Sequence, residues 1–129
     1  MQRVNLPSEW VERARVFLTD AERHLGEGHY WLTCFEAQQA AEFYVKSLLI
    51  ALTGVYPYTH DIVELLDTLA SVGVSIPDEM RIYGDVLTPH YTMARYPGRK
   101  PFTYDKGRGE RCLEGAKKIA SWVEKIADP

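Results

Sequence analysis

The chain has 129 residues, of which 46% are hydrophobic and 26% are charged, and its net charge is −3. A chain of this size can bury one hydrophobic core but has no room for a second full domain, so residues 1–129 are expected to form a single domain. This composition excludes a disordered tail and a protein that coats nucleic acid over its whole surface.

Two long amphipathic helices are predicted first. Apolar residues recur at three- and four-residue steps from Pro7 to about His24, which indicates one helix face, and Gly26 suits the end of that helix. A second helix is predicted from about His29 to Leu52. Its C-terminal half is apolar almost all round, so we expect this helix at the centre of a helical bundle.

Further helices follow after the turn at residues 53–60. A third helix begins near Asp61, whose carboxylate is placed to cap it, and a fourth begins at Pro77. Pro89 is expected to bend the fourth helix, which ends at about residues 95–96. A last helix covers about residues 109–127, and no segment has the alternation of a strand. The fold class is therefore all-α, a bundle of about five helices.

The sequence predicts no disulfide, no metal site and no cofactor. The N-terminus lacks the apolar run of a signal peptide, and no stretch has the roughly 18 apolar residues of a membrane span, so we expect a cytoplasmic protein. In that compartment Cys34 and Cys112, which are far apart in the sequence, are expected to be buried thiols. His24 and His29 lack the spacing of a zinc site, and there is no P-loop.

A local basic segment stands out on an otherwise acidic chain. Residues 1–94 hold 6 Lys and Arg against 13 Asp and Glu, whereas residues 95–111 hold 6 against 2. Such a segment can concentrate an anion at one place, although a solvated basic loop has the same composition. Arg95, at the end of its helix, has two interpretations: it stabilises the helix dipole, or it binds phosphate together with Tyr91, one turn earlier. Under the second interpretation five further cations converge on the same phosphate: Arg99, Lys100, Lys106, Arg108 and Arg111.

Three other polar residues are candidates for a binding site. His60 and Asp61 precede the third helix, where backbone N–H groups can hold an anion, although a simple N-cap explains Asp61 equally. Lys46 lies on a helix that is otherwise apolar, where it either extends outward to water or points into a groove.

The order of several short segments resembles the HEPN family (higher eukaryotes and prokaryotes nucleotide-binding). These segments are AQQAAE at residues 37–42, THDI at 59–62, ARYPG at 94–98 and a final helix with AKKIASWVEKI. The resemblance implies an antiparallel up-and-down helical bundle that pairs as a homodimer, with Arg95 facing a shared groove. It also implies a minimal nucleotidyltransferase as partner in a pair of toxin–antitoxin type.

Many HEPN proteins are metal-independent ribonucleases whose signature is an arginine and a histidine separated by four to six residues. Arg95 matches that arginine, but Lys100, Pro101 and Phe102 occupy the positions expected for the histidine. A histidine suits proton transfer near neutral pH far better than a lysine does. The first hypothesis is therefore a non-catalytic module that binds a nucleotide or RNA.

Two alternatives remain open at this stage. The protein is a ribonuclease toxin in which Arg95 works with a displaced histidine, His90 or His60, or it is an interaction bundle without a ligand site. Under the first hypothesis, the RNA- or nucleotide-binding residues are Arg95, Tyr96, Tyr91, Arg99, Lys100, Lys46, His60 and Asp61. Tyr96 serves there as a stacking platform or as a nucleotidyl acceptor.

Overall fold

The computed structural model describes residues 2–129, and these residues form helices without any strand, which confirms the all-α prediction. The helices are α1 (Ser8–Gly26), α2 (Tyr30–Thr53), α3 (Ile62–Ser71), α4 (Asp78–Leu87), α5 (His90–Met93) and α6 (Lys106–Ala127). The last helix begins earlier than its apolar pattern predicts, because Asp105 caps it by accepting a hydrogen bond from the Arg108 backbone N–H at 2.8 Å.

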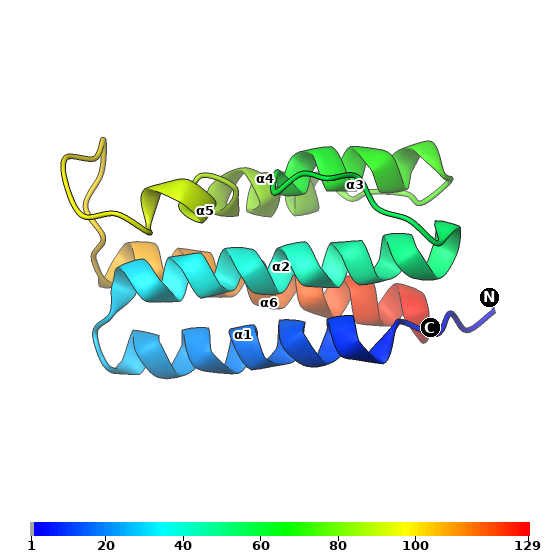
Figure 1. The fold of residues 1–129 in the computed structure, drawn as a ribbon, viewed down its shortest axis with the longest axis horizontal. Helices are drawn as coiled ribbons and strands as arrows, with labels where there is room; N and C mark the ends of the chain where they lie inside the picture. Colours follow the sequence, from blue (N-terminus) through cyan, green and yellow to red (C-terminus); the bar gives the residue numbers. More distant parts are fainter. Residues whose placement is uncertain (1) are drawn as a thin grey trace.

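The helices lie in three layers (Figure 1). The central layer holds α2 and α6, α1 covers one side, and α3, α4 and α5 cover the other. After α2, residues 54–61 run back along that helix, so α3 starts near its middle and runs in the same direction as α2. The chain ends meet, since the Val4 N–H donates to the Ala127 carbonyl at 2.8 Å.

The central position of α2 follows from its small and apolar residues. Ala37, Ala40 and Ala41 are all 0% exposed, because their short side chains let neighbouring helices approach closely. Helix α2 contacts each of the other helices, as its apolar surface predicts. Within residues 2–129, no helix is long and apolar enough to cross a membrane.

The fourth predicted helix breaks where its proline lies. Helix α4 ends at Leu87 and α5 begins at His90, because Pro89 has no N–H to donate to the previous turn. Thr88 and Pro89 nevertheless keep helical dihedral angles, so the chain bends and then continues in the same general direction. The Thr88 hydroxyl also accepts the Ile62 backbone N–H at 3.1 Å, which joins this bend to the start of α3.

The prediction that Cys34 and Cys112 remain separate thiols is wrong. The two residues form a disulfide between α2 and α6, with 5.1 Å between their Cα atoms, although both are buried as predicted. Cysteines separated by 78 positions carry no local sequence signal of pairing, and the expectation for a cytoplasmic protein pointed the other way. The disulfide joins the two helices of the central layer.

Candidate functional site

Arg95 lies just beyond α5 with its side chain exposed. Its guanidinium carbon is 4.6 Å from the centre of the Tyr91 ring and 5.6 Å from that of Phe35. These aromatic faces hold the cation without neutralising its charge. No carboxylate within residues 2–129 forms an ion pair with it. The guanidinium thus keeps its hydrogen-bond donors for an external anion.

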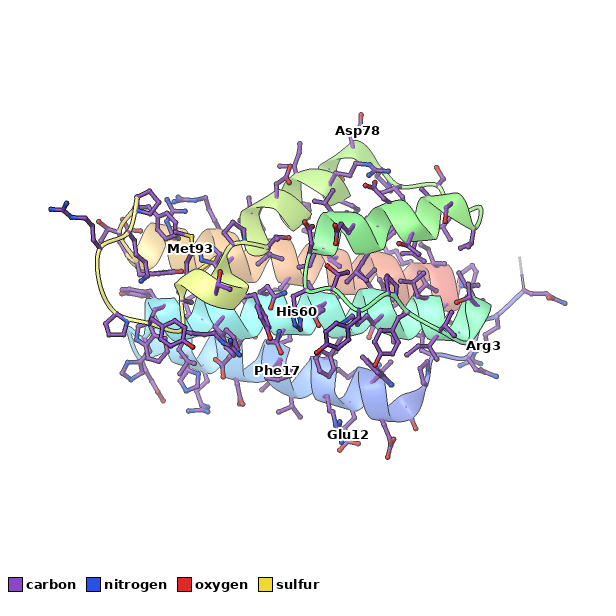
Figure 2. The ribbon with its side chains drawn as sticks, turned by 45° about the horizontal axis from the view of Figure 1, so that its top comes forward. Arg3, Glu12, Phe17, His60, Asp78 and Met93 are labelled. Atoms are coloured by element: carbon purple, nitrogen blue, oxygen red, sulfur yellow. A yellow bond between two sulfur atoms is a disulfide. The ribbon has the colours of Figure 1, made fainter. Side chains whose placement is uncertain are left out.

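Tyr91 connects Arg95 to His60. The rings of His60 and Tyr91 are stacked, with their centres 3.7 Å apart and their planes inclined by 12°. His60 reaches this position because residues 54–61 run back along α2 (Figure 1). Figure 2 shows the His60 side chain in front of that helix. The His60 side chain is 39% exposed, so this part of the site is open to solvent.

The buried carboxylate of Glu42 fixes the position of the His60 ring. Glu42 on α2 is 3% exposed, and its oxygens lie 3.1 and 3.2 Å from His60 Nδ1. The Gln38 side-chain amide donates to Glu42 at 3.0 Å and to the His60 carbonyl at 3.0 Å. Both the ring and the backbone of His60 are therefore fixed by residues of α2.

Lys46 completes this group, which we call the Glu42 cluster: Gln38, Glu42, Lys46 and His60. The Lys46 ammonium donates to Glu42 at 2.9 Å, and the residue is 5% exposed. The structure therefore gives Lys46 an internal partner, which contradicts its predicted role as a cation that points into an open groove. The sequence did contain a signal, because Glu42 and Lys46 are four residues apart on one helix.

A pocket of about 550 Å³ adjoins Arg95 on the loop between α5 and α6. Aromatic side chains line it, together with the two cations Arg95 and Lys100; the aromatic residues are Trp31, Tyr96, Phe102 and Tyr104. Trp31 is 46% exposed and Tyr96 is 67% exposed, so both rings are accessible to a ligand. We call this the Arg95 pocket. Its combination of rings and positive charge suits a planar base with a phosphate.

The other cations of the basic segment lie in two kinds of surroundings: some are at or near the Arg95 pocket, and one packs against an aromatic ring. Lys100 donates to the Tyr96 carbonyl, which holds it at the Arg95 pocket, and Arg99 is exposed on the same loop. The Arg108 guanidinium instead packs 4.0 Å from the centre of the Phe102 ring. The basic segment thus contributes some cations to the site and uses at least one in packing.

His90 is excluded as a replacement histidine at the site. It is 1% exposed, and its Nδ1 lies 2.6 Å from the Tyr104 hydroxyl. Burial, and to a smaller extent the charge of Arg108, lowers the pKa of His90 to about 4, so the ring is neutral near pH 7. A neutral histidine closed off from solvent cannot reach a bound nucleic acid, which corrects its assignment as a catalytic candidate.

Asp61 has the structural role that the sequence left open. Its carboxylate accepts hydrogen bonds from the backbone N–H groups of Val63 at 2.9 Å and Glu64 at 3.2 Å, and so caps α3. These are the N–H groups that an anion would otherwise use. Because these N–H groups already donate to Asp61, they are not free to bind a nucleotide phosphate, and the prediction of a nucleotide contact at Asp61 loses its basis.

Replacing this cap should lower stability. We expect Asp61→Ala to lower the free energy of unfolding by about 1 kcal/mol, measured by urea denaturation. Asp61→Asn is the matched control, because an asparagine oxygen still caps a helix. An unfolding free energy that is the same in Asp61→Ala and in the parent would contradict this assignment.

A model of the HEPN domain matches residues 7–126, nearly the whole chain. The chain belongs to the HEPN family. Among solved structures, TT1696 from Thermus thermophilus is 36% identical to this HEPN chain and superposes on it with a TM-score of 0.83. The match covers 92% of this chain and 95% of the TT1696 chain. No curated protein shows a significant match.

Two further solved structures are similar to this HEPN protein. ST0689, described as an archaeal HEPN homologue, is 28% identical with a TM-score of 0.77, over 99% of this chain and 100% of its own. An HEPN domain protein from Thermotoga maritima is 27% identical with a TM-score of 0.76, over 92% and 96%. Family membership indicates a helical module of nucleotide-binding or nuclease-like type.

Proposed function

We propose that this HEPN protein binds single-stranded RNA or a nucleotide through a phosphate at Arg95. The observation that carries this proposal is the exposed guanidinium, held against Tyr91 and without a carboxylate partner among residues 2–129. Arginine's planar fork matches two phosphate oxygens at once. The neighbouring Lys100 and Arg99 add charge that attracts the same polyanion.

The Arg95 pocket adds a place for a base beside that phosphate. Stacking of one base on an aromatic side chain contributes about 1–3 kcal/mol and depends little on sequence. The exposed rings of Trp31 and Tyr96 are the ones available for this contact. The binding module therefore combines phosphate recognition at Arg95 with stacking on Trp31 and Tyr96, and Tyr91 and His60 lie at its border.

We infer that binding, rather than cleavage, is the main activity. Phe102 stands at one of the positions expected for the family's histidine, and it packs against His90, with ring centres 5.5 Å apart, and against Arg108. A phenyl ring cannot transfer a proton. The site at Arg95 thus lacks the usual acid or base on its own loop.

One observation favours a ribonuclease as the second candidate function. His60 is part-exposed, its Nδ1 faces the buried Glu42 carboxylate, and its ring stacks on the Tyr91 that also contacts Arg95. A carboxylate behind a histidine orients the ring for proton transfer. If the protein cleaves RNA, we therefore assign the base to His60.

Equilibrium binding of a fluorescently labelled single-stranded RNA tests the proposal. Arg95→Ala should weaken binding at least about tenfold, because a charge-assisted contact of about 1.5–3 kcal/mol is removed. Binding by the parent should weaken as salt rises, with a logarithmic slope of roughly 0.7 for each phosphate contacted. Gel analysis of the same mixtures shows whether the RNA is cut.

Arg13→Ala is the matched control, since Arg13 is an exposed arginine in the first half of α1, at the opposite end of the bundle from the Arg95 loop (Figure 1). It should bind like the parent. Equal affinity of the parent and of Arg95→Ala would end the proposal. Cleavage by the parent that is lost in His60→Gln would establish the second candidate function instead.

We propose that the protein acts as a homodimer with a small nucleotidyltransferase as partner, on the basis of the family resemblance. Tyr96 is exposed and lines the Arg95 pocket together with Arg95 and Lys100, so its hydroxyl is the candidate acceptor for nucleotidyl transfer. Tyr96→Phe separates this role from stacking, because it removes the hydroxyl and keeps the ring. Light scattering of the purified protein, alone and with the partner, tests the assembly.

A further inference from the structure

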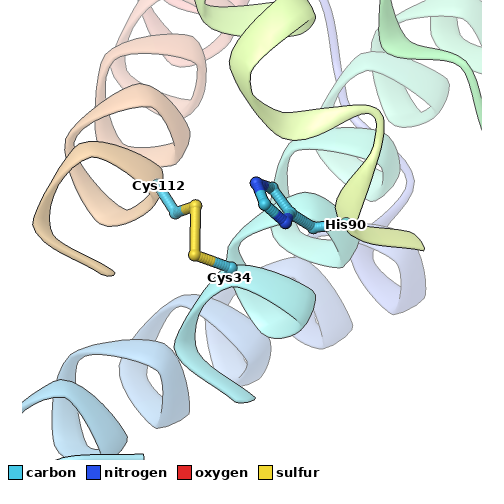
Figure 3. Close-up of side chains that lie close together, drawn as sticks. All are labelled: Cys34, His90 and Cys112. Atoms are coloured by element: carbon cyan, nitrogen blue, oxygen red, sulfur yellow. A yellow bond between two sulfur atoms is a disulfide. The ribbon is translucent and has the colours of Figure 1, made fainter. Parts of the chain in front are cut away.

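Three side chains of metal-ligating type that do not belong to the Glu42 cluster converge inside the bundle. Cys34 comes from α2, Cys112 from α6 and His90 from α5, and Figure 3 shows them pointing toward one another. One ligand atom from each lies within 4.8 Å of the other two. Their exposed fractions are 0%, 0% and 1%, so protein surrounds the group on every side.

The histidine of this group is held in a defined orientation. Its Nδ1 is engaged by the Tyr104 hydroxyl at 2.6 Å, which leaves Nε2 as the nitrogen available to a ligand. Histidines that bind metals commonly have such a hydrogen bond on the other ring nitrogen, because it fixes the ring and its tautomer. Tyr104 thus has the position of an orienting residue for His90.

The donor set determines which ion fits. Two sulfurs and one imidazole nitrogen are soft or intermediate ligands, which select thiophilic ions such as Zn²⁺ and Cu⁺ over Mg²⁺ or Ca²⁺. We propose that Cys34, Cys112 and His90 form a buried site for one thiophilic ion when both cysteines are reduced. The disulfide is the oxidised form of the same site.

The two forms interconvert by balanced chemistry. A dithiol reductant delivers two electrons and two protons to the S–S bond, which gives two Cys thiols, and the reductant itself becomes a cyclic disulfide. The ion then binds both sulfurs as thiolates and releases the two thiol protons. In the reverse direction a small-molecule disulfide is the oxidant: it accepts two electrons from the two thiolates and two protons from solvent and becomes two thiols, while the S–S bond of Cys34 and Cys112 forms and the ion is released.

The number of ligands and their burial favour Cu⁺ over Zn²⁺ at this site. Structural zinc sites take four ligands, whereas this group offers three and is closed to solvent. A three-ligand site of thiolate and imidazole suits Cu⁺, which is the softer ion. We therefore expect Cu⁺ to bind more tightly than Zn²⁺ at a stoichiometry of one ion per chain.

Metal titration of the full chain tests the site without reference to RNA. The protein is reduced, freed of metal and kept under nitrogen, and then titrated with Cu⁺ or with Zn²⁺, each against a coloured chelator for that ion. The reduced protein should take one ion from the chelator, and the oxidised protein should take none. This comparison uses the natural chain, so no variant needs to fold.

Substitutions then assign the ligands. Cys34→Ser and Cys112→Ser should each abolish uptake, and His90→Phe, which keeps a ring in the core, should weaken it at least about tenfold. Tyr104→Phe should weaken it about tenfold, while His29→Gln, at a histidine outside the group, should leave it unchanged. Failure of the reduced protein to take up either ion, or equal uptake by the oxidised protein, would overturn the proposal. Metal uptake by the reduced and oxidised protein is measured without RNA, so its outcome does not depend on whether the protein binds RNA.

Discussion

Reduction of the Cys34–Cys112 disulfide is expected to lower the free energy of unfolding by about 4 kcal/mol. The disulfide closes a loop of 78 residues, and a cross-link of that length removes much of the conformational freedom of the unfolded chain. It also joins the two helices of the central layer, so the loss applies to the whole fold. Urea denaturation with and without a thiol-free reductant, in the presence of a metal chelator, measures the difference.

A double variant provides the control for this measurement. Cys34→Ala/Cys112→Ala should resemble the reduced protein in its unfolding midpoint and should not respond to reductant. Thiol counting in denaturant should find no free thiol in the untreated parent and two after reduction. An unfolding midpoint that is the same in the oxidised and reduced parent would show that the disulfide adds nothing to stability.

Helical periodicity was sufficient to predict the fold class, but not every boundary. The recurring apolar residues predicted the long helices because each helix buries one continuous face, and α2 buries most of its circumference. The start of α6 was missed because the cap at Asp105 precedes the first apolar residue of the pattern. The bend at Pro89 was predicted, since the missing N–H is a property of the residue itself.

The candidate site was predictable only where it is local in sequence. Tyr91 and Arg95 are one helical turn apart, and the structure places the guanidinium over that ring. The stack of His60 on Tyr91 joins segments separated by a helix pair, so it depends on the path of residues 54–61. Trp31, at the start of α2, carries no sequence sign that it lines the Arg95 pocket.

The errors at Lys46 and His90 have one physical cause: the surroundings of each side chain depend on a partner residue, which a single position in the sequence does not reveal. Lys46 was judged against an apolar helix, although Glu42 four residues earlier neutralises it. His90 is offered by the sequence as a displaced histidine for Arg95, although its side chain turns into the core toward Cys34 and Cys112. A buried polar residue needs a partner, so each of these positions should be assessed as a pair.

Glu42→Ala is expected to destabilise the protein by about 3–5 kcal/mol, because it leaves the Lys46 ammonium buried without its carboxylate. Lys46 is 5% exposed and donates to Glu42 at 2.9 Å, while Gln38 and His60 also lose their acceptor. Urea denaturation of the parent and the variant measures this loss. Glu42→Gln, which keeps the shape and removes the charge, should lose part of the same free energy.

The double variant Glu42→Ala/Lys46→Met separates the unpaired charge from the lost packing. Replacing both charged groups removes the buried ammonium, so we expect the double variant to regain more than half of the stability that Glu42→Ala loses. If Glu42→Ala costs less than about 1 kcal/mol, the Lys46 side chain reaches water when its partner is removed. In that case the Glu42 cluster holds His60 in place through Gln38 and contributes little to the stability of the bundle.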